Sequence, residues 1–596
     1  MHFEWVKQAA GFLSPVFANQ IAETEIADAG VNAVKQVAII GAGAAGASTA
    51  YHLHKFAAEE GIELNVTIFE KTSHIGGRSL TVNAFDDPLQ PVELGASIFV
   101  EVNHILWNAT DTFNLTRVDP GADEPGTLAV WDGYHFVYEQ DSNSWGWWNL
   151  AKLFWKYGTA PYYTDKLVTE VVNTFLQLYE RPHFPFRSLS ARAFELGLTK
   201  ITGLTAEQFL TENKLNGAFA RDIVQASTRV NYASNLAHIH GLGAMVSMAP
   251  KGAVSVAGGN WQMFARMVEK SQAHVQLDTR VTSITEVKSK NPAAPASRFS
   301  ISTSKESGSK DDVQRHPTAF DNVVVAAPYQ FSGIKTEGDL FQQPIDEIPY
   351  VKLHVTLFAS PFQFSPEFFG LPAGTKTPTA VLTTLAEGEE PKPGADGAGR
   401  PGFFSVSLVK IVTNPKTENK EFVYKIFSPA TVTPEFLTKL LGVKVPETFT
   451  GSAATDASVI TEDGEATASA NAAVEPISWY HPAVFHPYPQ KLPRVTFQDP
   501  ILRDGLYYTS GIESFISTME TSALMGMNVA RLIVDDLVSS SVTSIEDDDI
   551  VVVEEVAPVA ASPAAPSSST EAVEEVVVED VVVEAVESVA EVVEEL

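Results

Sequence analysis

The sequence predicts an α/β protein in which an α+β substrate domain interrupts a Rossmann-like nucleotide-binding domain. Residues 37–40 (VAII) form a short apolar run, as expected of a strand buried on both faces. Gly41-x-Gly43-x-x-Gly46 follows and opens an alanine-rich helix. A second apolar strand, residues 65–69, ends in Glu70. This order of strand, glycine turn, helix, strand and acid is typical of a dinucleotide site, although the glycine motif alone is a weak signal.

Each residue type in the motif has a physical role. Gly41 allows the tight turn, Gly43 lets the backbone approach a pyrophosphate, and Gly46 lets helix and strand pack closely. The helix N-terminus presents unpaired N–H groups to the phosphate charge. Glu70 is placed to accept hydrogen bonds from ribose hydroxyls; the alternative is a solvated residue at the end of a strand.

Composition excludes several classes of function. The 596 residues can form two or more domains and carry a net charge of −32, and half of that charge lies in residues 546–596, which hold 16 acids and no base. No basic cluster suggests nucleic-acid binding. There is no cysteine, so disulfides, thiolate metal sites and a cysteinyl-linked flavin are excluded, and no metal site is predicted.

The two ends of the chain carry signals of their own. Residues 1–34 are either a secretory leader, with an apolar stretch at 9–18, or a disordered N-terminus. The charged, Pro- and Ser-rich residues 538–596 predict a disordered acidic tail. No run is long enough to span a membrane, so the protein is expected to be soluble or peripheral. Glycosylation sequons begin at Asn65, Asn108 and Asn114, which is near the chance number.

A second glycine turn favours a flavin over a nicotinamide. Gly76, Gly77 and Arg78 follow the second strand, and the segment EKTSHIGGR resembles the glycine-doublet element of the FAD-dependent superfamily that includes amine oxidases and phytoene desaturases. In that superfamily the C-terminal part of the chain returns to the flavin. Residues 505–532 have the expected form: a strand, Gly511, a loop, and a helix that starts near Thr518.

The middle of the chain resembles a narrower family. SWGWWNLAKLFWKYG, ASTRVNYASNLAHIHGLGAMVSMA, VSVAGGNWQMFARMV, FVYKIFSPATVT and DGLYYTSGIESFISTMETSA are similar, in order, to segments of prenylcysteine oxidase, also called prenylcysteine lyase. The resemblance implies an FAD enzyme that uses oxygen to cleave farnesyl- or geranylgeranyl-cysteine into a prenyl aldehyde, cysteine and hydrogen peroxide. It also implies action in the lysosome or vacuole, where prenylated proteins are degraded.

The resemblance also implies site residues and domain boundaries. The implied cofactor contacts are Gly41, Gly43, Ala44, Ala45, Gly46, Glu70, Lys71, Gly76, Gly77, Arg78, Val281, Gly511, Met519 and Glu520. The FAD-binding domain is expected to comprise residues 35–100, 252–330 and 500–537. The substrate domain is expected to comprise residues 101–251 and 331–499. Two polar insertions, 387–400 and 448–473, predict exposed loops.

Three residues are weak catalytic candidates. Residues 350–358 alternate as in a half-buried strand, and its polar face, with Lys352 and His354, either meets the flavin or is an ordinary solvated face. Arg229 either holds the carboxylate of the substrate or forms a structural ion pair. The aromatic stretch 145–163 either packs on the core or forms an apolar channel or a membrane-contact face for a lipid-like substrate.

The reaction itself demands no acid–base triad, because a flavin carries the redox step and the protein mainly positions the substrate. Two other functions compete with thioether oxidation. One is a flavin amine oxidase, and the other is a non-catalytic isoprenoid-binding flavoprotein. Fold alone does not separate the three.

Overall fold

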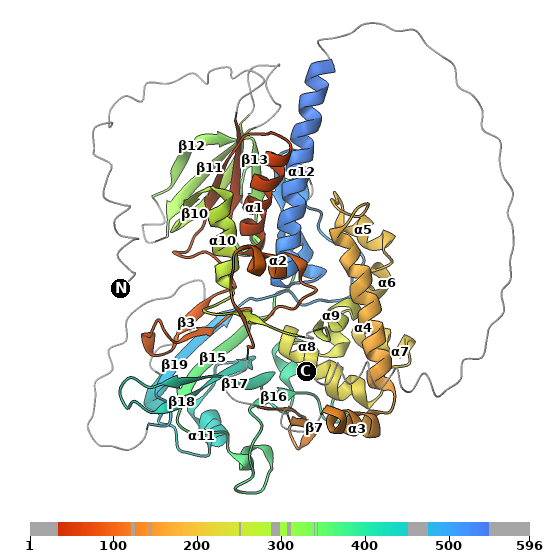
Figure 1. Ribbon diagram of the computed structural model, residues 1–596, viewed down its shortest axis with the longest axis vertical. Helices are drawn as coiled ribbons and strands as arrows, with labels where there is room; N and C mark the ends of the chain where they lie inside the picture. Colours follow the sequence, from red (N-terminus) through yellow and green to blue (C-terminus); the bar gives the residue numbers. More distant parts are fainter. Residues whose placement is uncertain are drawn as a thin grey trace, which may run out of the picture.

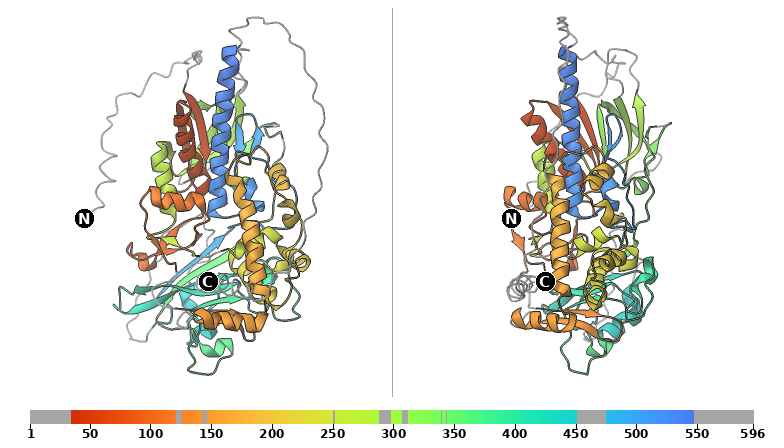
Figure 2. Two further views of the ribbon diagram at one scale, coloured as in Figure 1. Left: turned by 45° about the vertical axis from the view of Figure 1, so that its right-hand side comes forward. Right: turned by 90° about the vertical axis from the view of Figure 1, so that its right-hand side faces the viewer.

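The computed structural model describes residues 34–120, 126–141, 146–249, 252–287, 298–306, 312–338, 340–342, 344–450 and 475–546. The expected leader, the 448–473 insertion except its first three residues, and the tail beyond residue 546 lie outside these ranges. A nucleotide-binding part occupies one end of the molecule, and a large sheet with a layer of helices occupies the other (Figures 1 and 2). The α/β architecture agrees with the sequence prediction.

The nucleotide-binding part is built on a six-stranded sheet in the order β20-β21-β13-β1-β2-β9. The strand β1 (Lys35–Ile40) pairs in parallel with β2 (Leu64–Phe69) and β13 (Asn322–Val325). The outer strands are β9 (His274–Gln276), β21 (Leu506–Tyr508) and the antiparallel β20 (Ile501–Arg503). Three distant parts of the sequence therefore form one sheet, because each contributes a short apolar strand that needs burial on both faces.

Helices cover this sheet. The helix α1 (Ala44–Glu59) lies beside the long α12 (Met519–Glu546) and close to α10 (Trp261–Ser271), as Figure 1 shows. The backbones of α1 and α12 approach closely at Gly526, where a Cβ atom would lie 2.3 Å from the carbonyl oxygen of Ala45. The Ser48 hydroxyl donates a 2.6 Å hydrogen bond to the Ala523 carbonyl across the same contact. Small residues thus make this helix pair possible.

A four-stranded sheet packs beside the nucleotide-binding sheet in the order β12-β11-β10-β14. Its strands are β10 (Thr279–Val287), β11 (Arg298–Lys305), β12 (Gln314–Phe320) and β14 (Lys335–Thr336). β14 lies beyond residue 330, where this segment of the FAD-binding domain was expected to end. Ile284, Phe299 and Phe320 join Val323 and Val325 of β13 in one apolar core, so the two sheets are packed together.

The substrate part is built on a seven-stranded sheet in the order β19-β15-β18-β17-β16-β6-β7. These strands are β6 (Thr127–Trp131), β7 (Phe136–Asp141), β15 (Leu353–Ser360), β16 (Ala380–Thr383), β17 (Ser405–Thr413), β18 (Lys420–Ser428) and β19 (Trp479–Phe485). Only β6 and β16 pair in parallel. The short hairpin β3 (Thr81–Asn83) and β4 (Pro91–Glu93) packs on this sheet, although the predicted boundaries place it in the nucleotide-binding part.

The predicted alternation along β15 is only partly right. His354 is half-buried, but Thr356 and Phe358 on the same face are buried, as are their neighbours from Val355 to Ser360. The strand lies between β18 and β19, and α11 (Pro434–Leu441) and nearby aromatic residues cover the second face. Thr356 and Phe358 lie on the face that was expected to be solvated, but packing buries them as well.

A group of helices packs together beside the substrate sheet, and α8 contacts β16: α3 (Gly146–Tyr157), α4 (Ala160–Leu176), α5 (Leu189–Glu195), α6 (Thr199–Thr202), α7 (Ala206–Glu212), α8 (Gln225–Tyr232) and α9 (Gly241–Ser247). The aromatic stretch 145–163 spans α3 and the start of α4. Tyr157 packs in the core, and its hydroxyl bonds to Asp222. Trp155 and Tyr163 point outward, with exposed fractions of 93% and 51%. Among the described side chains of this stretch, Tyr157 thus contacts the core while Trp155 and Tyr163 are exposed, and residue 145 lies outside the described residues.

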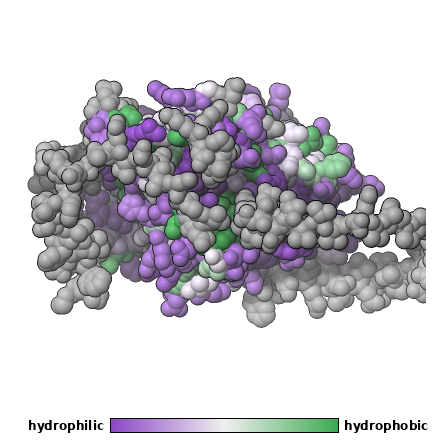
Figure 3. Space-filling model, turned by 90° about the horizontal axis from the view of Figure 1, so that it is seen from above, coloured by the Kyte–Doolittle hydropathy of each residue, from purple (hydrophilic) through white to green (hydrophobic). Residues whose placement is uncertain are grey.

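The helix α2 (His104–Thr112) contacts α12, so it belongs with the nucleotide-binding helices rather than with the substrate part. The helix α12 continues to Glu546, which corrects the prediction that the tail begins at residue 538. None of the helices described here is long and apolar enough to cross a membrane. Figure 3 shows a mainly hydrophilic surface from above, with hydrophobic residues in small groups.

The contact between α1 and α12 gives a direct test of the packing. Gly526→Ala should lower the free energy of unfolding by about 1–3 kcal/mol, because its new methyl group would overlap the Ala45 carbonyl. The matched control is Gly217→Ala, since a Cβ there meets no atom within 4 Å. Urea unfolding of both variants measures the difference, and equal stability of the two would contradict this account of the helix contact.

Candidate functional site

The glycine motif forms a tight turn at the start of α1. Gly41 has φ +107°, and a Cβ there would lie 2.9 Å from the Ala326 carbonyl oxygen. A Cβ on Gly46 would lie 1.9 Å from the Gly41 carbonyl oxygen. Gly43 precedes α1 in extended conformation, and no side chain caps the helix or places an acid in its first turn. The first N–H groups of α1 therefore lack a side-chain acceptor, which suits an anion.

The glycine doublet lies against this turn. The Gly76 N–H donates a 3.0 Å hydrogen bond to the Ala42 carbonyl, and Gly43 and Gly76 form an isolated parallel bridge. Gly77 has φ +58°, and a Cβ there would lie 3.1 Å from the Gly43 Cα. The two glycine turns, more than thirty residues apart in sequence, thus form one continuous backbone cradle.

Hydrogen bonds to the Glu70 carboxylate stabilise this cradle. It is buried, and its Oε2 accepts a 2.8 Å hydrogen bond from the Ala42 N–H, while its Oε1 accepts from the N–H and the hydroxyl of Thr72. The Thr279 N–H, at the start of β10, donates to the Glu70 carbonyl. Val281 is therefore close to the end of β2, and its contact with the cofactor stays a prediction. That Glu70 also accepts from a ribose stays a prediction.

Arg78 joins the cradle to the C-terminal part of the chain. Its guanidinium forms two hydrogen bonds of 2.7 and 2.8 Å with the Glu513 carboxylate and one of 2.6 Å with the Pro487 carbonyl. Glu513 is 2% exposed and also accepts from the Tyr350 hydroxyl at 3.0 Å. Burial lowers the pKa of Arg78, but the Glu513 carboxylate more than offsets this, so the net pKa is raised. Arg78 is half-buried: 36% of its side chain is accessible, which leaves space for a bound group beside it.

The C-terminal residues implied by the resemblance lie on two sides of this ion pair. Gly511 belongs to the turn Ser510–Ser514 that carries Glu513. Met519 and Glu520 begin α12, but the Glu520 carboxylate accepts hydrogen bonds from Ile105 and Leu106 at the N-terminus of α2. Burial raises the pKa of Glu520 to about 7. The Glu520 side chain therefore ties two helices together.

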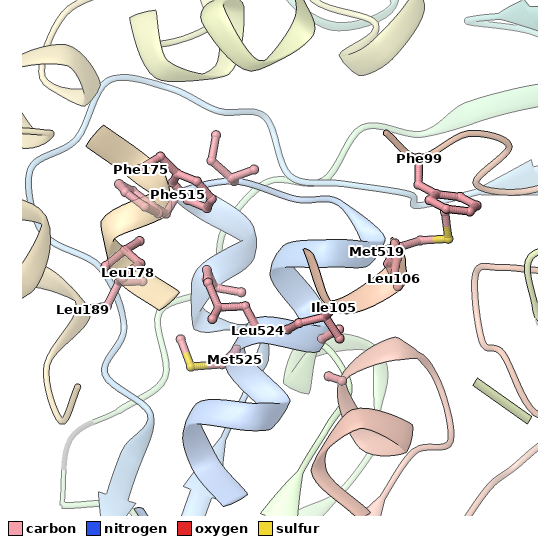
Figure 4. Close-up of a cluster of buried hydrophobic side chains, with 14 of the residues drawn as sticks. Phe99, Ile105, Leu106, Phe175, Leu178, Leu189, Phe515, Met519, Leu524 and Met525 are labelled. Atoms are coloured by element: carbon pink, nitrogen blue, oxygen red, sulfur yellow. The ribbon is translucent and has the colours of Figure 1, made fainter. Parts of the chain in front are cut away.

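An apolar cluster borders the same turn. Figure 4 shows Phe175 of α4 beside Phe515, with Met519, Leu524 and Met525 of α12 below them. The ring centroids of Phe175 and Phe515 are 6.1 Å apart. An open pocket of about 470 Å³ is lined by Gln330, Phe331, Glu347, Ile348, Pro349, Tyr350 and His486. Tyr350 connects this pocket to the ion pair through its hydrogen bond to Glu513, and Phe515 connects the apolar cluster to the same turn.

Arg229 is corrected to a structural residue. It is fully buried on α8, and its guanidinium donates to Thr383, Asn235 and the carbonyls of Gly397 and Ala398. All of these acceptors are neutral, so neither a substrate carboxylate nor an ion pair uses it. Burial lowers its pKa to about 9. These carbonyls belong to the 387–400 insertion, which is therefore partly a core element rather than an exposed loop.

No described hydrogen bond links Lys352 or His354 to the Arg78–Glu513 ion pair. Lys352 is exposed. The His354 Nδ1 lies 3.4 Å from the Thr431 hydroxyl, and burial lowers the pKa of His354. Glu513 and Tyr350 were not among the site residues predicted from the sequence. The only sequence signal for Glu513 is its place two residues after Gly511.

Comparison with known proteins identifies the family. The profile of the prenylcysteine lyase family matches residues 140–548, and that of an NAD(P)-binding Rossmann-like domain matches residues 39–113. The chain belongs to the prenylcysteine lyase family. It is 27% identical over 525 residues to farnesylcysteine lyase of Arabidopsis thaliana and 28% identical over 514 residues to prenylcysteine oxidase 1 of Bos taurus. Each match covers 84% of this chain and 88% of the relative.

A solved structure of a putrescine oxidase triple mutant matches the fold with a TM-score of 0.50 and 14% identity, covering 85% of this chain and all of that one. The chain is an FAD-dependent oxidoreductase of α/β architecture. The residues present fit this cofactor. The uncapped N-terminus of α1 and the two glycine turns suit a pyrophosphate, and the accessible space beside Arg78 suits a further part of the molecule. The individual contacts stay predictions.

Gly43 gives a test that separates cofactor binding from folding. A Cβ at Gly43 would meet the nearest protein atom at 3.7 Å, an ordinary contact, but it would occupy space needed by the pyrophosphate. Gly43→Ala should therefore purify with little FAD and unfold like the FAD-depleted wild type. Gly46→Ala should lose both FAD and stability, because its methyl group overlaps Gly41. The flavin-to-protein absorbance ratio and thermal unfolding measure both effects. Full FAD occupancy in Gly43→Ala would show that the cradle is misassigned.

Proposed function

We propose that this chain oxidises the thioether of a prenylcysteine, farnesyl- or geranylgeranyl-cysteine. The observation that carries the proposal is that the family match covers most of the substrate domain as well as the C-terminal part of the nucleotide-binding domain. Relatives named farnesylcysteine lyase and prenylcysteine oxidase align over most of the chain. The match therefore extends to the part of the molecule that would select a substrate.

The reaction balances as one thioether, one water and one O₂ giving one prenyl aldehyde, one cysteine and one hydrogen peroxide. FAD supplies a hydride acceptor for the carbon next to sulfur. The resulting cation is stabilised by sulfur and by the allylic double bond; water adds to it, and the hemithioacetal breaks its C–S bond. The protein's task is to hold the prenyl chain, admit one water and keep the thioether in place.

Described residues suit these tasks. The Arg78–Glu513 pair fixes the turn Ser510–Ser514 against the glycine doublet. The apolar cluster around Phe175 and Phe515 and the pocket beside Tyr350 border that turn. Burying a prenyl chain contributes about 0.8 kcal/mol per methylene-sized group before ordering costs. Affinity should therefore rise steeply with chain length.

Molecular oxygen is the electron acceptor in this proposal, and the lysosome or vacuole is the proposed location, because degradation of prenylated proteins releases this substrate there. We also propose peripheral contact with membranes through Trp155 and Tyr163, whose exposed rings suit the membrane–water interface. Such contact would bring the enzyme to a substrate that partitions into lipid.

The decisive experiment adds farnesylcysteine to the oxidised protein without oxygen. The flavin absorbance should bleach as farnesal forms, and air should restore it with one peroxide formed for each farnesal. A carrier that only binds isoprenoids would keep its flavin oxidised. An amine oxidase would bleach with putrescine or another amine and leave farnesylcysteine unchanged.

S-Methylcysteine serves as the control substrate, because it keeps the thioether and the amino acid but lacks the prenyl chain. The proposal expects much slower turnover of S-methylcysteine at equal concentration. Equal turnover of the two compounds would reject a prenyl-binding site even if the protein were an oxidase.

A further inference from the structure

Lys491 is a buried cation with no hydrogen-bond partner in the described structure. It lies between β19 and β20 and is 1% exposed. Its Nζ has no acceptor within hydrogen-bond distance. The nearest aromatic groups are the ring of Tyr232, with its centroid 3.5 Å from Nζ, and the ring of Tyr488, at 5.1 Å. Aromatic faces attract a cation but accept no conventional hydrogen bond, so all three donors of an ammonium group stay unused.

Lys491 differs in this respect from the other buried cations described here. The donors of Arg229 are taken by Thr383, Asn235 and main-chain carbonyls. Lys425 donates to the carbonyls of Glu93 and Gly95 and to the Ser97 hydroxyl, which uses its three protons. Both side chains are therefore satisfied by the protein, and only Lys491 among the three has donors left for a ligand.

Lys491 is also held next to the site described above. Its carbonyl accepts a 2.7 Å hydrogen bond from the His240 N–H, and the His240 Nε2 lies 3.3 Å from the carbonyl of Ser514, the residue after Glu513. The main chain of the same segment meets Arg78 at Pro487 and Tyr350 at Pro489. Glu513 accepts from Arg78 and Tyr350, and Lys491 Nζ donates no hydrogen bond to it.

Building on the proposed function, we infer that Lys491 binds the α-carboxylate of the cysteine moiety of the substrate. A prenylcysteine is an amino acid with an apolar tail, so a buried site must supply a cation for its carboxylate. Arg229, for which the sequence left this role and a structural ion pair open, has all its donors taken by neutral protein groups. A protonated Lys491 has the charge opposite to that of a carboxylate and has unused donors. Its main chain is held beside the turn that carries Glu513.

The surroundings of Lys491 favour the binding of an anion beside its Nζ atom. Taking an ammonium group out of water without an anion is costly, and burial lowers the pKa of Lys491 well below its ordinary value, although Glu513 opposes this effect. A carboxylate would stabilise the charged form. The rings of Tyr232 and Tyr488 cover Nζ, so binding requires the flexible lysine side chain to turn or the rings to part.

The test compares farnesylcysteine with its methyl ester, which keeps the thioether, the amino group and the prenyl chain but has no negative charge. Wild-type protein should show a kcat/KM for the acid at least about tenfold above that for the ester. Lys491→Met should remove this preference by lowering kcat/KM for the acid, mainly through KM, with little effect on the ester. Lys491→Arg should restore part of the preference, because it keeps the positive charge.

Two further measurements separate binding from a structural role. Lys491→Met should keep its bound FAD and unfold at the same temperature as wild type or higher, because it removes an unpaired buried charge. Lys270→Met, the same change at an exposed lysine of α10, should alter neither kinetics nor stability.

The outcomes are distinct. Failure of wild type to oxidise farnesylcysteine rejects the proposed function itself. Turnover of acid and ester with equal kcat/KM by wild type rejects the role of Lys491 without using any variant. An unchanged preference in Lys491→Met, or an equal loss with both substrates, also overturns the inference.

Discussion

The ion pair between Arg78 and Glu513 is the interaction on which the site depends. It joins a loop near the start of the chain to a turn more than four hundred residues later, and Tyr350 adds a third segment. Two parallel hydrogen bonds fix the relative positions of these loops more tightly than apolar contact alone would. Because the Glu513 carboxylate gives up its water, it stabilises the site only while Arg78 and Tyr350 are there to donate to it. The glycine cradle, the apolar cluster and the pocket beside Tyr350 are held in place around it.

The nucleotide-binding fold could be predicted from local sequence because its signals are local. The strand at residues 37–40, the three glycines and the helix follow each other within a few residues, and their spacing fixes the geometry. Elements whose burial depends on distant neighbours were harder to predict. The alternation in β15 indicated one exposed face, but β18, β19 and α11 bury most of both. The helix α12 continues to Glu546, where the Ser- and Asp-rich sequence had indicated an unstructured tail.

The candidate site likewise contains residues that local sequence predicts and residues that only the fold brings together. The cradle glycines could be predicted because their spacing in the sequence is typical of a dinucleotide-binding turn. Glu513 could not be found from sequence, because a lone acid carries no signal until the fold brings Arg78 and Tyr350 beside it. For Arg229 the sequence left a substrate carboxylate and a structural ion pair open, and neither is its partner, because the acceptors that satisfy it come from an insertion more than 150 residues away.

The central claim is that Arg78 and Glu513 act as one unit in holding the cofactor site. A double-mutant cycle with Arg78→Met, Glu513→Gln and the double variant tests it through the dissociation constant of FAD. The account predicts a coupling free energy of about 1–3 kcal/mol, because the two groups are in direct contact and Arg78→Met leaves the buried Glu513 carboxylate without its cation. Additive effects within about 0.5 kcal/mol would contradict it and show that the two residues hold the site independently.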